Sequence, residues 1–410
     1  MKYGCIGEKL GHSFSLEIHE KIGLYDYVLK PLAREEVPGF LKKRDFLGIN
    51  VTIPYKKDVM PHLSEISPEA ALCGAVNTVV NRGGRLMGYN TDFLGMKELL
   101  AYGKIPISGK KVLILGSGGT SGTAQKLCES LGAERINRVS RSGRDGCLTY
   151  EEALRLSDTQ IILNTTPCGM YPDLEGSPIS LEGFPSLEGV LDAVYNPAKT
   201  TLLQDAEKRG ISHIGGLYML VSQAVHAASI FTGREDLLCR IEPIFREMEE
   251  EKRNLVLIGM PGCGKSTLGR ILARRLGKEL IDSDEEIEKE TGKKIPALVA
   301  REGETAFRDA ESRVIRRLSA LRGKVIATGG GAVLRRENVE YLRGNGTLNF
   351  LDAPLHALTA TSSRPLSSTR EDLEKRYRER IEIYAESADI RVPVTRDEKE
   401  NVERIRKVLG

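Results

Sequence analysis

Two glycine-rich loops, each directly after a short apolar run, constrain the fold of this 410-residue chain most strongly. The first loop, residues 116–122, reads Gly-Ser-Gly-Gly-Thr-Ser-Gly, and the second, residues 259–266, reads Gly-Met-Pro-Gly-Cys-Gly-Lys-Ser. Further apolar runs alternate with longer, charge-rich helical patterns along the chain, which predicts alternating strands and helices with mostly parallel sheets. We therefore expect an α/β protein with two separate nucleotide-binding regions.

The length of the chain fits two or three domains. The charged run 246–253 leads straight into the apolar run 254–258, so we place a domain joint near residue 250, although a solvated helix face is the favoured explanation of the charges themselves. A second break, at residues 103–109, precedes the first glycine loop. The expected domains are residues 1–105, completed by about 217–248, then a Rossmann-type domain at 106–216, and a third at 253–410.

The charge balance and the cysteine pattern limit the partners and the compartment. The chain has 60 basic and 57 acidic residues, a net charge of +3, so no field of one sign favours nucleic acid or membrane as a partner. Its seven cysteines form no Cys-x-x-Cys pair, and its six histidines show no metal-ligand spacing with them. No apolar run approaches the ~18 residues of a membrane span. We expect a cytoplasmic protein that acts on small molecules.

The first glycine loop lies in the strand, turn and helix context that a dinucleotide site requires, since glycines let a pyrophosphate approach backbone amides at a helix N-terminus. Where a NAD site usually offers an acid to the ribose, this chain offers arginines, which suit the 2′-phosphate of NADP. A tight turn without a ligand and plain surface arginines remain alternatives. The residues expected at NADP or NADPH are Gly116, Ser117, Gly118, Gly119, Thr120, Ser140, Arg141 and Arg144.

Lys56 and Asp92 are the catalytic candidates of the first half. Hydride addition to a ketone needs a proton donor at the developing alkoxide, and a lysine held by a carboxylate can stabilise that charge and supply the proton. Taken alone, Lys56 beside Lys57 would more often be a solvated charge, and Asp92 more often a helix cap.

The motifs of the first half resemble, in order, those of shikimate dehydrogenase. The resemblance covers about residues 1–248 and rests on residues 11–15, 50–56, 74–78, 88–92, 116–122, 164–167 and 216–224. It implies a two-lobed dehydrogenase that reduces 3-dehydroshikimate to shikimate with NADPH, with Lys56 and Asp92 as the catalytic pair. Leu16 stands where the family usually has a proline. The resemblance further implies Ser13, Ser15, Thr52, Asn77 and Gln223 at the substrate, and Tyr195 and Gly216 near the ring and the nicotinamide.

The second glycine loop satisfies the pattern Gly-x-x-x-x-Gly-Lys-Ser between an apolar run and a helical pattern. Its backbone amides can hold phosphates, Lys265 can reach the β- and γ-phosphates, and the Ser266 hydroxyl can bind Mg²⁺. One carboxylate, Asp282, can assist the metal through water. The residues expected at ATP are Gly262, Cys263, Gly264, Lys265, Ser266 and Thr267.

The residues after this loop resemble, in order, the motifs of shikimate kinase over about residues 253–395, although each alone could be a cap or a solvated helix residue. The resemblance implies a P-loop kinase with a parallel sheet that phosphorylates the 3-hydroxyl of shikimate with ATP. It implies Arg364 as a lid arginine, although residues 354–363 form a short lid without the family's extra arginine. It implies Asp284, Arg308, Gly330 and Arg380 at the substrate, with Lys265, Asp284 and Arg364 catalytic.

The two halves point to one bifunctional enzyme, because the product of the first expected reaction is the substrate of the second. One alternative keeps two enzymes but changes the substrates, with quinate or NAD in the first half and another small polyol in the second. A second alternative treats one half as a binding or regulatory module without catalysis. The oligomeric state does not follow from the sequence.

Overall fold

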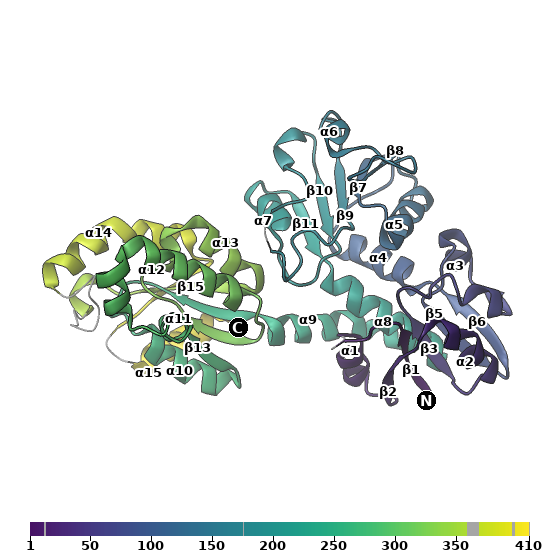
Figure 1. Cartoon of the computed structure of the whole chain (residues 1–410), viewed down its shortest axis with the longest axis horizontal. Coiled ribbons are helices and arrows are strands. Elements are labelled where there is room, and N and C mark those ends of the chain that lie inside the picture. The colour runs from purple at the N-terminus through teal and green to yellow at the C-terminus, as the bar shows by residue number, and fades with distance from the viewer. Residues whose placement is uncertain (12–13, 175, 359–368, 396–397, 410) are drawn as a thin grey trace. The chain divides into compact units, whose positions relative to one another are not determined.

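The computed structural model describes residues 1–11, 14–174, 176–358, 369–395 and 398–409 (Figure 1). The chain forms two compact units, Met1–Met248 and Glu249–Gly410. Helix α9 (Ile241–Lys252) contains the boundary, and the first strand of the second unit follows it after one residue. None of the helices in the described part of the chain combines the length and the apolar character needed to cross a membrane.

The first unit begins with a six-stranded sheet in the order β2-β1-β3-β5-β6-β4. This sheet is mixed, because β5 pairs antiparallel with both β3 and β6. The β5–β6 hairpin turns at Gly83 and Gly84, which have φ values of 58° and 86° that only glycine adopts readily. The strands are β1 (Tyr3–Gly7), β2 (Tyr27–Pro31), β3 (Gly48–Val51), β4 (Glu65–Ile66), β5 (Thr78–Arg82) and β6 (Arg85–Tyr89). The helices that belong to this lobe are α1 (Phe14–Ile22), α2 (Val37–Lys43), α3 (Pro68–Cys73), α4 (Thr91–Tyr102) and α8 (Leu217–Thr232).

The second sheet of this unit has five parallel strands in the order β11-β10-β9-β7-β8. The chain passes from β8 to β9 across β7, so a switch of direction lies at the carboxyl end of β7, where open α/β sheets bind ligands. The strands are β7 (Lys111–Leu115), β8 (Arg135–Val139), β9 (Ile161–Asn164), β10 (Gly189–Asp192) and β11 (Ser212–Gly215). The helices are α5 (Gly119–Ser130), α6 (Tyr150–Ala153) and α7 (Thr201–Lys208).

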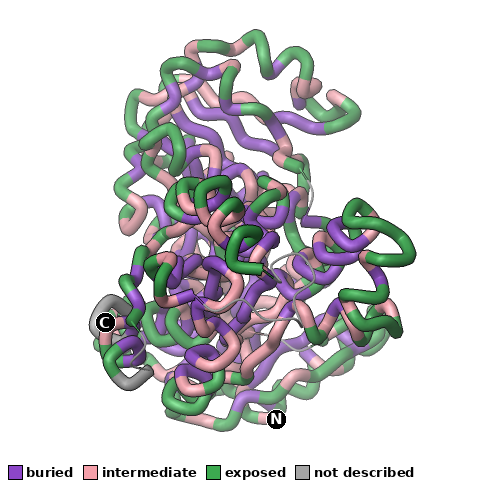
Figure 2. The backbone as a smooth tube through the Cα atoms, turned by 90° about the vertical axis from the view of Figure 1, so that its left-hand side faces the viewer, coloured by how far each residue is buried: buried purple, intermediate pink, exposed green. Residues whose placement is uncertain are grey.

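One hydrophobic cluster joins helices α4 and α8 of the first lobe to the second sheet of the first unit. It combines Met96 of α4 and Val221 of α8 with Ile114 of β7 and Leu163 of β9, all fully buried. Buried and exposed stretches alternate along the backbone, as Figure 2 shows, which is the pattern of strands covered by helices. Because α4 and α8 carry side chains of both the core and the site, the packing of this cluster fixes the site.

The second unit is built on five parallel strands in the order β13-β14-β12-β15-β16. All five residues of the central strand β12 are buried, as expected for a strand covered on both faces. Gly303, at φ 86° and ψ 168°, kinks the long helix α12. The strands are β12 (Asn254–Ile258), β13 (Glu279–Asp282), β14 (Lys324–Ala327), β15 (Gly346–Asp352) and β16 (Ile390–Pro393). The helices are α10 (Lys265–Leu276), α11 (Ser283–Thr291), α12 (Ile295–Ser319), α13 (Arg336–Asn345), α14 (Arg370–Ser387) and α15 (Glu398–Leu409).

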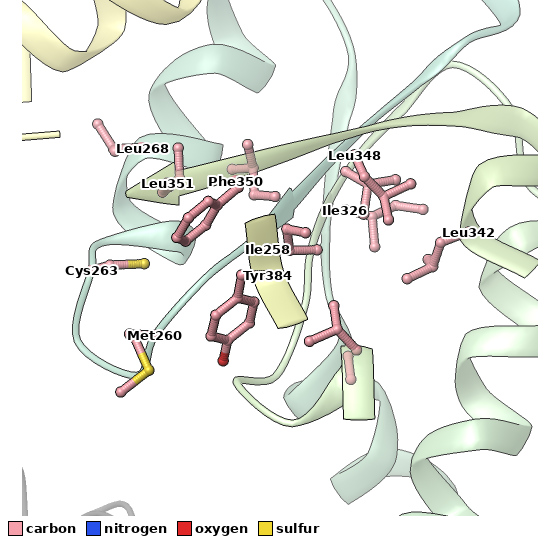
Figure 3. Packing of buried hydrophobic residues seen from close by; sticks show 14 of the residues in the cluster. Ile258, Met260, Cys263, Leu268, Ile326, Leu342, Leu348, Phe350, Leu351 and Tyr384 are labelled. Carbon is pink, nitrogen blue, oxygen red and sulfur yellow. The ribbon is translucent and has the colours of Figure 1, made fainter. Parts of the chain in front are cut away.

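The core of the second unit reaches the second glycine loop. Phe350 of β15 stacks on Tyr384 of α14 with ring centroids 5.4 Å apart. Figure 3 shows the side chains of Met260 and Cys263, both from the glycine loop, beside these rings. The loop is therefore held by apolar side chains on its inner side, which leaves its backbone amides for the outer side.

Candidate active sites

Lys56 and Asp92 form an ion pair in the first unit. Lys56 follows β3, and Asp92 lies in the first turn of α4, a helix capped by the Asn90 side chain. The Lys56 Nζ lies 2.5 Å from the Asp92 Oδ2, and the two side chains are 31% and 22% exposed. The pair is thus preformed and open to a ligand on one side, which is the arrangement that a proton donor held by a carboxylate requires.

Asn77 lies beside this pair with its amide oxygen fully engaged. The Asn77 Oδ1 accepts from the backbone N–H of Thr91 at 2.7 Å and from the hydroxyls of Thr78 and Thr91 at 3.1 and 3.2 Å. The Thr78 hydroxyl also accepts from the Nδ2 of Asn50, and the Oδ1 of Asn50 accepts from the Tyr27 hydroxyl. This chain of bonds leaves the Asn77 Nδ2 as the group offered to the pocket.

A pocket of about 220 Å³ gathers most of the substrate residues expected from the sequence. Ser13 lies outside the described residues. The sequence reasoning missed Cys5, Asn50, Met219 and Leu220, which also line the pocket. Burial raises the pKa of the Cys5 thiol to about 12, so this cysteine stays protonated and is no nucleophile. The expected residues that line the pocket are Ser15, Thr52, Lys56, Asn77, Asp92, Thr120, Tyr195, Gly216 and Gln223.

The first glycine loop connects β7 to α5 at the switch point of the second sheet. Gly116 has a φ of 119°, and a Cβ there would lie 2.6 Å from the Thr165 Oγ1, so no larger residue fits. Gly118 caps α5, and nothing lies within 4 Å of a Cβ placed on Gly118 or Gly119. The open face of the loop at a helix N-terminus fits a dinucleotide pyrophosphate. Ser117 is exposed beside these glycines.

Ser140, Arg141 and Arg144 follow β8, the strand next to β7. The Ser140 hydroxyl accepts from the backbone N–H of Gly143 at 3.1 Å, which shapes the turn. Arg141 and Arg144 are exposed, and neither forms an ion pair with any carboxylate that the structure describes. Two free guanidinium groups next to a dinucleotide loop fit a 2′-phosphate, so the donor set agrees with NADP.

The second glycine loop has the backbone that a phosphate cradle needs. Gly259, Gly262 and Gly264 have φ values of 144°, 87° and 90°. Residues with a Cβ rarely adopt such a backbone conformation. Gly264 caps α10, whose first residue, Lys265, is 8% exposed. The Lys265 Nζ donates to the carbonyl oxygens of Gly259 and Met260 at 2.7 and 3.1 Å. The ammonium group is therefore held inside its own loop.

Ser266 and Asp282 present the oxygen atoms expected at a magnesium ion. The Ser266 Oγ donates to the Asp282 Oδ2 at 2.6 Å, and the Asp282 Oδ1 accepts from the backbone N–H of Asp284 at 3.0 Å. In the described part of the chain, no group of three or more His, Cys, Asp or Glu side chains could hold a metal by itself. Mg²⁺ fits such a site, because it keeps waters and takes phosphate oxygens besides one or two protein ligands.

Arg308 and Arg380 face the same cavity from α12 and α14. Arg308 Nη1 pairs with Glu311 at 2.7 Å and its Nη2 with Glu304 at 3.1 Å. Arg380 donates to the carbonyl oxygen of Gly330 at 3.3 Å. Burial lowers the pKa of Arg380 and raises the pKa of Glu311. Buried guanidinium groups of this kind are suited to a planar anion such as a carboxylate.

The cavity of the second unit measures about 360 Å³. Sequence reasoning missed Glu285, Glu288, Phe307, Glu311 and Arg376, which line it as well. Arg364 and residues 359–368 of the expected lid lie outside the described residues. The Cys263 side chain packs among core residues (Figure 3), and Cys263 does not line the cavity, so its backbone is the part that could meet a nucleotide. The expected residues that line the cavity are Gly262, Gly264, Lys265, Ser266, Thr267, Asp282, Asp284, Arg308, Gly330 and Arg380.

Comparisons with known proteins identify the families to which the two units are similar. Residues 5–79 match the family model of the shikimate dehydrogenase substrate binding domain, and residues 261–410 match that of shikimate kinase. The NADP(+) shikimate dehydrogenase of Clostridium perfringens (strain ATCC 13124) is 36% identical over 265 residues, which are 60% of this chain and 98% of the relative. The chain belongs to the shikimate dehydrogenase family. Its C-terminal part is a shikimate kinase domain, so both expected enzyme families are confirmed.

Two solved shikimate dehydrogenase structures are similar to the first unit. A chorismate mutase/shikimate 5-dehydrogenase fusion protein from Clostridium acetobutylicum is 35% identical with a TM-score of 0.56, and covers 60% of this chain and 97% of its own. Shikimate 5-dehydrogenase from Thermus thermophilus, in complex with NADP(H) and shikimate, is 31% identical with a TM-score of 0.54, and covers 60% of this chain and 99% of its own. The expected α/β fold is confirmed.

Proposed function

We propose that this chain reduces 3-dehydroshikimate to shikimate with NADPH in its first unit and phosphorylates shikimate with ATP in its second. The observation that carries the proposal is the pair of preformed sites in one chain. Lys56 and Asp92 form an ion pair beside amide and hydroxyl groups, and Lys265 and Ser266 of a phosphate loop face Asp284 and two arginines. The first site makes the substrate of the second.

In the first reaction, bound NADPH supplies the hydride, and the protein supplies position and a proton. Lys56 donates the proton to the oxygen of the reacting ketone, and Asp92 keeps the ammonium group aimed and charged. The hydroxyl and amide groups around them hold a small polyhydroxylated acid. These substrate-binding residues are Ser13, Ser15, Thr52, Asn77, Gln223 and Tyr195, with Gly216 near the nicotinamide.

The cofactor of the first reaction binds along the carboxyl ends of β7 and β8. The amides of residues 116–120 hold the pyrophosphate, and Arg141 and Arg144 hold the 2′-phosphate beside Ser140. This arrangement makes NADPH, rather than NADH, the preferred donor. The proposed domains are residues 1–105 with about 217–248 for substrate and catalysis, 106–216 for NADP, and 253–410 for the kinase.

In the second reaction, bound ATP supplies the phosphoryl group, and Mg²⁺ supplies positive charge that neutralises the phosphates. The loop amides and Lys265 hold the phosphates, and Ser266 and Asp282 hold the metal. Asp284 orients the acceptor hydroxyl, while Arg308, Arg380 and the amide of Gly330 hold the substrate carboxylate. Arg364 is assigned to the transferring phosphoryl group.

We place the enzyme in the cytoplasm. All seven cysteines are free thiols in the structure, and a reducing compartment keeps thiols in that state. The cytoplasm also contains the soluble substrates NADPH and ATP.

The proposed function is tested by incubating the purified chain with 3-dehydroshikimate, NADPH, ATP and Mg²⁺, and identifying the products by mass spectrometry. Parallel reactions each omit one cofactor. We expect shikimate 3-phosphate in the full mixture, shikimate alone without ATP, and no product without NADPH. Shikimate alone in the full mixture contradicts the kinase half, and no turnover contradicts the reductase half.

The substrate alternatives are separated by selectivity. Quinate and shikimate are offered with NADP or NAD in the oxidative direction, and kcat/KM is compared for the four pairs. We expect shikimate with NADP to be preferred. A preference for quinate or for NAD contradicts the assignment of the first site.

A further inference from the structure

Asp192, the last residue of β10, is a carboxylate with 0% exposure that the proposed reaction does not use. No lysine, arginine or histidine in the described ranges forms an ion pair with it. Burial of a carboxylate without a cation costs free energy of folding, so the hydrogen bonds of Asp192 must offset that cost.

Three hydrogen bonds satisfy the Asp192 side chain. Its Oδ1 accepts from the Asn164 Nδ2 at 2.9 Å and from the backbone N–H of Val194 at 3.0 Å. Its Oδ2 accepts from the Thr200 hydroxyl at 2.6 Å. Asp192 therefore ties the end of β9, the segment after β10 and the start of α7 to one point.

The segment held by Asp192 forms a wall of the dehydrogenase pocket. Ala193 and Tyr195 line that pocket together with Lys56 and Asp92. The carbonyl oxygen of Val194 accepts from the backbone N–H of Gly216, another lining residue, at 2.9 Å. A Cβ on Gly216 would lie 2.1 Å from the carbonyl oxygen of Ala193, so only glycine fits at this close contact.

Asn164, the hydrogen-bond partner of Asp192 at the end of β9, connects Asp192 to the first glycine loop. The Asn164 Oδ1 accepts from the backbone N–H and the hydroxyl of Thr166 at 3.0 and 2.7 Å. Thr165, between them, donates its hydroxyl to the carbonyl oxygen of Leu115 at 2.6 Å, directly before the first glycine loop. Asn164 and Asp192 thus fix the two turns that lie between the cofactor loop and the substrate pocket.

We propose that Asp192 is a positioning residue for the reduction, which holds residues 193–197 so that Tyr195 and Ala193 meet the substrate beside Lys56. This inference rests on the proposed reductase function. A displacement of about 1 Å in a pocket wall can reduce turnover about 100-fold, so the loss of a fixed turn has a measurable effect.

The protonation state of Asp192 gives this role a pH signature. Burial raises the pKa of Asp192 to about 6, although its three hydrogen bonds oppose the rise. The residues paired with it on the neighbouring strands, Asn164 and Gly215, do not titrate. The pKa of the Cys168 thiol is raised by burial and, to a smaller extent, by the charges of Asp173 and Asp192. Below pH ~6 the protonated carboxyl accepts fewer hydrogen bonds, because its own proton must be donated to Thr200.

The test compares Asp192→Asn and Asp192→Ala with the wild type in the full chain. We expect Asp192→Ala to lower kcat/KM for 3-dehydroshikimate by about 10- to 100-fold. The Kd for NADPH, measured by the fluorescence of the bound cofactor, should stay within threefold. Asp192→Asn resembles the protonated carboxyl, so its KM for 3-dehydroshikimate should exceed the wild-type value about threefold at pH 7.5 and equal it at pH 5.

A second pair of variants covers the case in which Asp192→Ala does not fold. Thr200→Val removes the hydroxyl that Oδ2 accepts from, and Thr200→Ser keeps it. We expect a rise of about threefold in KM for Thr200→Val and rescue by Thr200→Ser. The kinase activity of the same chain measures the amount of enzyme in every sample.

Several results overturn the inference. One is an Asp192→Ala enzyme with kcat and KM within twofold of wild type, and another is a loss confined to the Kd for NADPH. A ratio of KM between Asp192→Asn and wild type that stays constant from pH 5 to 7.5 also overturns it. A wild-type chain without reductase activity contradicts the proposed function itself, whereas an active wild type with unaffected variants contradicts only the role of Asp192.

Discussion

The two pockets of this chain balance their charges in different ways. In the dehydrogenase pocket the Lys56 ammonium already lies 2.5 Å from its carboxylate, and the Asn77 oxygen is fully bonded. In the kinase pocket the Lys265 ammonium donates to uncharged atoms of its own loop, and Arg380 pairs with no carboxylate that the structure describes. The first site is complete as a set of protein groups, whereas the second leaves positive charge for an anionic ligand to neutralise.

The two glycine loops also differ, in the number of their glycines that have a positive φ. The first has a single glycine in the left-handed region, Gly116, and offers the open N-terminus of α5. The second has three such glycines, so its backbone amides are turned toward one point before the helix begins. A pyrophosphate needs only an open helix N-terminus such as that of the first loop. A triphosphate with its metal needs the converging amides of the second loop together with Lys265 and Ser266. The comparison predicts that the charged side chains of the two sites can be disabled separately.

The largest expected effect is the loss of reduction in Lys56→Met. Methionine keeps most of the side-chain volume but cannot donate a proton to the developing alkoxide, so kcat should fall about 1,000-fold. Lys57→Met, which changes the exposed neighbouring lysine, is the matched control and should retain full activity. Both rates are measured from NADPH oxidation, with kinase turnover on added shikimate as an internal standard. A Lys56→Met enzyme within tenfold of wild type rules out this lysine as the proton donor.

The next largest effect is the loss of phosphorylation in Lys265→Met. Removal of one charged group at a transferring phosphoryl group should lower kcat about 100- to 1,000-fold. Lys289→Met changes an exposed lysine that pairs with Glu286 on the surface, and it should leave the kinase unchanged. The measurement is the rate of shikimate 3-phosphate formation. Equal losses of reductase and kinase activity would show that the substitution unfolds the whole chain. They would not support a specific role for Lys265 in the kinase site.

An intermediate effect is expected for the cofactor arginines. In Arg141→Gln/Arg144→Gln two charge-assisted contacts to the 2′-phosphate are lost, so the preference for NADPH over NADH should fall about 10- to 100-fold. Arg155→Gln, at another exposed arginine of the same domain, is the control. The ratio of kcat/KM for the two cofactors is the quantity measured. An unchanged ratio would mean that the two arginines are plain surface charges.

The glycine loops and their flanking runs made the α/β fold predictable, and the ordered motifs around them made both families predictable. The apolar runs around residues 112–115 and 255–258 lie inside β7 and β12, and the loops follow where expected. The mixed first sheet was not predicted, because the β5–β6 hairpin depends on pairing between strands rather than on a local pattern. Residues at the carboxyl ends of strands were the ones that sequence reasoning located well.

The missed residues share a physical reason. Glu311 has the sequence context of a solvated helix residue, and only the packing of α12 buries it beside Arg308. Asp192 and Asn164 are 28 positions apart and meet because β9 and β10 are neighbours in register. Such contacts follow from strand order, which no single motif records. The roles of the individual site residues stay predictions until variants are measured.

The smallest expected effect is that of Cys263→Ala, within the loop that contains Lys265. Cys263 is 8% exposed and its side chain packs in the core, while its backbone N–H donates to the carbonyl oxygen of Met260 at 3.2 Å. If the loop acts through its backbone, loss of the thiol should change kcat and the KM for ATP by less than threefold, and should lower stability by only about 1 kcal/mol. Kinase kinetics and thermal unfolding measure the two quantities. A kinetic loss as large as that of Lys265→Met would mean that this side chain takes part in the chemistry, and the division between backbone and side-chain roles in the second site would have to be redrawn.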